Sequence, residues 1–156
     1  MKSDDFKRIV DHMRTSNYPR RTLFVTSVEL NNVRKLVSSL DVHEAEIGLM
    51  IPTTDATPEK QLDKRLRDVC EEYRNKRKEP ACLIVKDAVL LARFSISLTP
   101  LLRNAISPRS LVILCVPKAP EMISQPNLLN LIEQDFMQPI QRLARQISEP
   151  DCIIEE

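Results

Sequence analysis

The chain has 156 residues, of which 29% are charged and 42% hydrophobic, as expected for one soluble globular domain. Its 23 lysines and arginines balance 22 aspartates and glutamates, so the net charge of +1 gives no global attraction to nucleic acid or to an anionic membrane. The polar start and the lack of any apolar run of roughly 18 residues predict a cytoplasmic protein without a membrane partner.

Two residue types restrict the possible chemistry. Gly48 is the only glycine, which excludes both glycine-rich phosphate motifs, G-x-x-x-x-G-K-[ST] and G-x-G-x-x-G. The four cysteines form no C-x-x-C pair and lie far from the two histidines in the sequence, which favours buried thiols over a zinc site. We therefore expect no metal and no cofactor.

The first half of the chain alternates between helices and strands. Apolar residues at helical spacing predict a helix over 3–16, with Ser3 as its N-cap. A strand over 22–28, a helix over 29–40 and a second strand over 47–52 follow. The clearest helix begins at Pro58 and runs to about Lys78, and its buried stripe consists of Leu62, Leu66, Val69, Cys70 and Tyr73.

Two apolar runs, Ala81–Val85 and Leu111–Val116, organise the second half. Both are short and the second is continuously apolar, which predicts strands covered on both faces of a parallel sheet. One or two short helices, broken near Thr99 and Pro100, are expected between them. A final helix over 127–148 contains Pro139, so it is either kinked there or restarts, and the tail 151–156 is expected to be a short edge strand.

This alternation predicts a single α/β domain over residues 1–156. Its N-terminal helix is 3–16, its core 20–120 and its C-terminal helix 127–148. Right-handed crossovers then give three α/β/α layers around a mostly parallel sheet of about four to five strands.

A ligand crevice in such a fold lies at the carboxyl ends of the strands. The residues at those ends make up the predicted ligand site: Thr26, Ser27, Thr53, Asp87 and Lys118. The alternative is that polar residues end strands only because loops meet water. Lys86 and Asp87 are adjacent on one strand and point to opposite faces, which argues against a shared metal site of the nuclease type.

A second candidate surface is the basic run near the end of the long helix. Arg74, Lys76, Arg77 and Lys78 could contact the phosphates of a nucleic acid. Interleaved acidic residues, including Glu72 at the i,i+4 position from Lys76, are also typical of a solvated helix face. Aromatic residues for base stacking are scarce, since the chain has no tryptophan.

The order of strands and helices over residues 20–120 resembles the core of P-loop ATPases of the AAA type. The segment 81–87, ACLIVKD, resembles a degenerate Walker B strand, and 110–117 followed by Lys118 is similar to the later strand that carries a sensor residue in that family. The segment 26–32, TSVELNN, stands where the phosphate loop would be, without glycine or lysine, and Ala88 replaces the acidic residue that usually follows Asp87. The resemblance therefore implies a scaffold that has lost hydrolysis.

A response-regulator-like sheet is a competing match, but Thr26 and Ser27 stand where two acidic residues would follow its first strand. We therefore expect a non-catalytic interaction protein, an accessory or pseudo-ATPase subunit that binds another protein or itself. The alternative is a module that binds a nucleotide or a nucleic acid through the strand ends or the run 74–78. An enzyme is the third possibility, because no catalytic triad or metal spacing is recognisable.

Overall fold

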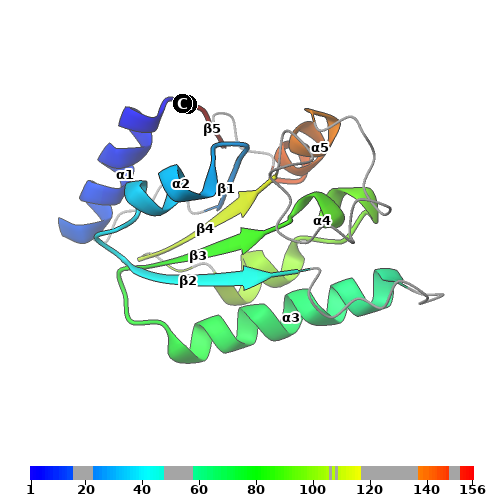
Figure 1. Ribbon diagram of the computed structural model, residues 1–156. Coiled ribbons are helices and arrows are strands. Elements are labelled where there is room, and N and C mark those ends of the chain that lie inside the picture. The colour runs from blue at the N-terminus through cyan, green and yellow to red at the C-terminus, as the bar shows by residue number, and fades with distance from the viewer. Residues whose placement is uncertain (16–22, 48–57, 106, 108, 117–136, 148–151) are drawn as a thin grey trace.

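The computed structural model describes residues 1–15, 23–47, 58–105, 107, 109–116, 137–147 and 152–156. These residues form a five-stranded sheet with helices on both of its faces (Figure 1). The strands are β1 (Leu23–Thr26), β2 (Asp41–Glu46), β3 (Ala81–Lys86), β4 (Ser110–Cys115) and β5 (Ile153–Ile154). All pairings are parallel and the order is β2-β3-β4-β1-β5, which confirms the predicted α/β class.

The helices divide into two layers. The first layer consists of α1 (Ser3–Thr15) and α2 (Leu30–Leu36), which cover one face of the sheet. The opposite face is covered by α3 (Pro58–Lys76), α4 (Val89–Arg93), the π-helix η1 (Leu101–Ala105) and α5 (Met137–Ile147). The predicted three-layer architecture is therefore present.

The core lies on both faces of β3 and β4, the two apolar runs of the sequence. Side chains alternate along these strands. The α3 side buries Leu83, Val85, Val112 and Leu114, and the α1 side buries Cys82, Ile84, Leu111 and Ile113. The stripe predicted for α3 is also buried, with Leu62, Leu66, Val69, Cys70 and Tyr73 each at most 4% exposed.

The position of the second strand differs from the prediction. The sequence favoured 47–52, whereas β2 is Asp41–Glu46 and residues 48–52 lie outside the described part. The predicted helix over 29–40 is correspondingly shorter, since α2 ends at Leu36. The reason is that β2 is an edge strand, and its half-exposed sequence, DVHEAE, lacks the apolar run on which the prediction relied.

The predicted edge strand in the tail is present as β5, which pairs with β1. The first residues of the chain also bond to this tail. The amino group of Met1 donates to the Ile153 carbonyl at 2.7 Å, and the Glu155 N–H donates to the Met1 carbonyl at 2.8 Å. The Ser3 hydroxyl donates to the Glu155 carbonyl at 2.8 Å, so Ser3 ties the tail to α1 and is not the predicted N-cap.

The remaining helices agree in part with the prediction. Two short helical segments are present, but the break between them lies at 94–98, and Thr99 and Pro100 begin the second segment. In the C-terminal helix the described part is Met137–Ile147, so Pro139 is its third residue, and residues 127–136 lie outside the described part. The kink or restart at Pro139 therefore stays a prediction.

Candidate functional site

Thr26 lies at the end of β1, at the centre of the predicted ligand site, but its hydroxyl is already used inside the protein. The side chain is 0% exposed. Its hydroxyl donates to the Ile154 carbonyl at 2.8 Å and accepts the Val28 N–H at 3.0 Å. Thr26 therefore joins β1 to β5 and shapes the turn after β1, and it presents no free hydroxyl to a ligand.

The connection from β1 to α2 is too short to wrap around a phosphate group. Only residues 27, 28 and 29 separate Thr26 from Leu30. Val28 is buried and Ser27 is half-buried, while the Glu29 carbonyl accepts the N–H groups of Asn32 and Val33 at 2.9 and 3.0 Å. A phosphate loop needs about eight positions and several glycines, whereas this turn has neither the length nor the composition.

Asp87 turns the chain out of β3. It is 4% exposed and has a φ angle of 55°, in the left-handed region that aspartate tolerates better than most residues. Its carbonyl accepts the Leu90 N–H at 3.2 Å at the start of α4, and the neighbouring Ala88 N–H donates to the Cys115 carbonyl at 3.0 Å. Asp87 thus has a structural role at the position that the sequence assigned to a ligand.

The sequence did not predict an ion-pair cluster on the α2 side of the strand ends. Arg34 of α2 donates from Nε and Nη2 to the two carboxylate oxygens of Glu44 at 2.8 and 2.7 Å. Lys86 Nζ lies 3.7 Å from Glu44 and 3.0 Å from Glu46. The hydrogen bond from Arg34 lowers the pKa of Glu44. The two cations and the two carboxylates of this cluster therefore balance one another in charge.

The sequence missed this cluster because Glu44 and Glu46 belong to the misplaced strand β2. Residues 41–46, DVHEAE, show no alternation of polar and apolar residues, so the pattern held no signal for them. Two other predicted site residues, Thr53 and Lys118, lie outside the part of the chain that the structure describes. The strand-end site is therefore described only at Thr26, Ser27 and Asp87.

The four residues of the predicted basic run do not form one surface. Lys76 pairs with Glu72 at 2.8 Å, as its i,i+4 spacing suggested. Arg77 donates to the Ala105 carbonyl at 2.8 Å, and its guanidinium lies over the Tyr73 ring at 5.3 Å. The backbone N–H of Lys78 donates to Asp41 at 2.8 Å. Arg74 alone lines the groove beside η1.

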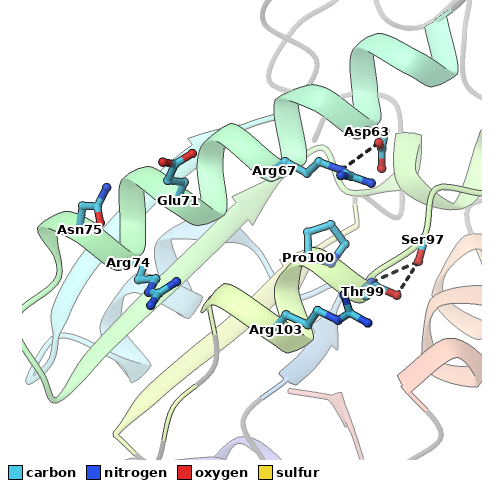
Figure 2. Close-up of a pocket in the computed structure, with 9 residues that line it drawn as sticks. All are labelled: Asp63, Arg67, Glu71, Arg74, Asn75, Ser97, Thr99, Pro100 and Arg103. Atoms are coloured by element: carbon cyan, nitrogen blue, oxygen red, sulfur yellow. Dashed lines mark hydrogen bonds and ion pairs between the residues drawn. The ribbon is translucent and has the colours of Figure 1, made fainter.

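That groove, between α3 and the segment 97–103, is the larger of the two described cavities, with a volume of about 370 Å³ (Figure 2). We call it the arginine groove. The residues that line it are Asp63, Arg67, Glu71, Arg74 and Asn75 of α3, and Ser97, Thr99, Pro100 and Arg103 of the facing segment. The sequence analysis had marked Arg74 as part of the basic run but had not joined it to Ser97, Thr99 or Arg103.

The arginine side chains of the groove differ in whether they form ion pairs with described residues. Arg67 pairs with Asp63 at 3.0 Å. Arg74 and Arg103 are exposed, and neither forms an ion pair with any described residue. Figure 2 shows the Arg74 side chain on the side of α3 that faces η1, and the Arg103 guanidinium beside Thr99. Within the described part of the chain, neither Arg74 nor Arg103 has a carboxylate within ion-pair distance.

The described residues show no sign of a metal site or of a membrane span. No three or more histidine, cysteine, aspartate or glutamate side chains of this part could together hold a metal ion. No helix within it is long and apolar enough to cross a membrane. Comparison with protein-family models gives no match for the chain, and comparison with curated proteins gives none either.

Proposed function

We propose that this chain is a non-catalytic α/β protein that acts through contacts with another protein, as an accessory or pseudo-ATPase subunit of a larger assembly. The observation that carries the proposal is that polar side chains described at the strand ends already bond to other groups of the protein. The Thr26 hydroxyl donates to the Ile154 carbonyl of β5, and Lys86 forms ion pairs with Glu44 and Glu46. The turn after β1 has only three residues, 27–29. A reaction centre would need polar groups that are available to a substrate.

The strand order supports the ATPase-like part of the proposal. β4 lies between β1 and β3, and Asp87 directly follows β3, an arrangement that AAA-type ATPase cores also have. The scaffold would then be retained without the loop that binds phosphate, since fold and chemistry are separable in evolution.

ATP turnover by the purified protein tests the loss of catalysis. We expect no turnover above that of a buffer control. Asp87→Asn is the informative variant, because asparagine tolerates the left-handed backbone at this position. The matched control is Asp68→Asn, at an exposed position of α3. Turnover that disappears in Asp87→Asn and persists in Asp68→Asn would refute the proposal.

The interaction role is tested by isolating the protein from its native cell at its natural abundance. We expect one partner protein, or further copies of this chain, at a fixed stoichiometry in a particle of defined mass. Charge reversal on the exposed face of the long helix, in Lys64→Glu, should weaken that particle if α3 is the contact surface, and Lys7→Glu on α1 is the matched control. A monomer in the native extract would contradict the proposal.

A further inference from the structure

The arginine groove is lined by more positively charged than negatively charged side chains. Three arginines, Arg67, Arg74 and Arg103, face two carboxylates, those of Asp63 and Glu71. Asp63 is already paired with Arg67. Glu71 forms no ion pair with any described residue, and Figure 2 shows its carboxylate directed away from Arg103. The positive charge of Arg74 and Arg103 is therefore available to an anion.

The helix and the facing segment hold these groups on opposite sides of one cavity. Arg67 and Arg74 are seven residues apart, which places them two helical turns apart on the same side of α3. Arg103 belongs to η1, whose Leu101 and Ala105 are 0% exposed and anchor it in the core. Both walls are thus fixed by packing, with Arg74 on one and Arg103 on the other, and in Figure 2 the Arg103 guanidinium extends toward Thr99.

Hydroxyl groups complete one end of the groove. The Ser97 and Thr99 hydroxyls lie 2.8 Å apart, and the Thr99 N–H lies 3.3 Å from the Ser97 hydroxyl oxygen. One of the two hydroxyl protons is used in the bond between them, so the exposed pair can donate one O–H to an incoming oxygen. Guanidinium and hydroxyl donors around a small polar cavity are the groups that recognise phosphate oxygens.

We propose that the arginine groove binds the phosphate group of a small phosphate monoester, with Arg74 and Arg103 as the principal ligands and the hydrogen-bonded pair of Ser97 and Thr99 as one additional donor. A monoester carries close to two negative charges near neutral pH, which matches two arginines without carboxylate partners. This inference is independent of the proposed interaction function, because it concerns the groove between α3 and η1 and not the strand ends.

The size and surroundings of the groove favour a small ligand over a nucleic acid. A volume of about 370 Å³ lies within the range of small-molecule pockets. Beyond the groove, Lys76 is neutralised by Glu72, and Arg77 is turned toward the Ala105 carbonyl. Lys76 and Arg77 therefore do not extend the groove toward a phosphodiester backbone, and Tyr73, the aromatic residue of α3, is buried.

Titration with inorganic phosphate and with adenosine 5′-monophosphate, followed by NMR of the arginine side chains, tests the proposal. We expect saturable shifts of the Arg74 and Arg103 signals with both probes and none with adenosine. The Arg74→Gln/Arg103→Gln variant should weaken binding by about tenfold or more, equal to about 1.4 kcal/mol. The matched control is Arg8→Gln/Arg14→Gln, which removes the same charge from exposed positions of α1.

Three results would overturn the proposal. The first is the absence of saturable shifts in the folded protein at about millimolar phosphate, the weak end of specific affinities. The second is equal weakening in the α1 control, which would indicate attraction by net charge alone. The third is tighter binding of a single-stranded oligonucleotide without a terminal phosphate, which would assign the groove to phosphodiesters. Circular dichroism of each variant verifies that the fold is intact.

Discussion

A buried hydrogen-bond chain fastens η1 to the sheet, and its removal gives a quantitative test of the structure. The Tyr73 hydroxyl of α3 is bonded to the Ser110 hydroxyl of β4, which donates to the Ala105 carbonyl at 2.9 Å. Because each hydroxyl has one proton, Tyr73 must donate to Ser110. Burial raises the pKa of Tyr73, so its phenol remains protonated and able to donate near neutral pH.

The two single substitutions should differ in cost. Tyr73→Phe removes one donor and leaves the Ser110 hydroxyl bonded to Ala105, so we expect a loss of about 1 kcal/mol. Ser110→Ala removes the bond to Ala105 and also leaves the Tyr73 hydroxyl buried without an acceptor, with 2% of the residue exposed. Its expected cost is about 2–4 kcal/mol, because an unsatisfied buried group loses its hydration in full.

The double variant separates this explanation from simple packing loss. When Tyr73→Phe is already present, Ser110→Ala leaves no hydroxyl without an acceptor. The stability losses of the two single variants should therefore add up to about 1–2 kcal/mol more than the stability loss of the double variant. Urea unfolding followed by circular dichroism measures all four proteins, and the m values should agree.

The control for this cycle is Thr15→Ala, which removes an exposed hydroxyl bonded to the carbonyls of Asp11 and His12. Its effect should stay within about 0.5 kcal/mol. Additive costs in the cycle, or a greater loss in Tyr73→Phe than in Ser110→Ala, would refute the assigned direction of the hydrogen bonds.

Three further predictions concern the strand ends and the thiols. Thr26→Val should lower the free energy of unfolding by about 1–3 kcal/mol, measured by urea unfolding, because it leaves buried backbone groups unpaired; an unchanged stability would return Thr26 to the ligand site. The pKa of Asp41 is lowered by hydrogen bonds from the Lys78 N–H and from His43, so Asp41 stabilises the fold above the pKa of the unfolded carboxyl, and this stabilisation is lost as the pH falls through the folded pKa. The difference in unfolding free energy between the native chain and Asp41→Asn should therefore disappear in acid. A difference that stays constant with pH would contradict the assignment. Burial raises the pKa of Cys70 and of Cys115 to about 12, so both thiols should react slowly with a disulfide reagent in the folded protein and rapidly in urea, and fast reaction in the folded state would be the contrary result.

The sequence predicted best those elements whose burial is nearly complete. Buried side chains are apolar, so burial leaves a pattern in the sequence. This pattern is a short continuous apolar run in β3 and β4 and a helical period in α3. β2 failed because an edge strand of a parallel sheet pairs on one side only, so its side chains, such as His43 and Glu44, remain half-exposed. The ion pairs of Glu44 could not be foreseen once the strand had been placed six residues too late, at 47 in place of 41.

The candidate sites show a different limit. The sequence showed that Thr26 and Asp87 are polar residues at strand ends. It contained no information on whether their polar groups already have hydrogen-bond partners within the protein. The partner of the Thr26 hydroxyl, Ile154, lies 128 residues away along the chain. Likewise Arg103 approaches α3 only because η1 packs against it, and no local pattern connects these two segments.

The two regions can be ranked by what a ligand would have to displace. At the strand ends a phosphate would compete with the bidentate pair of Arg34 and Glu44 and with the contacts of Lys86, and binding would have to recover the energy of each broken ion pair. In the arginine groove the exposed guanidinium groups of Arg74 and Arg103 exchange only hydration for contact with a charged ligand. An anion therefore gains more at the groove, although the fold class alone would have directed attention to the strand ends.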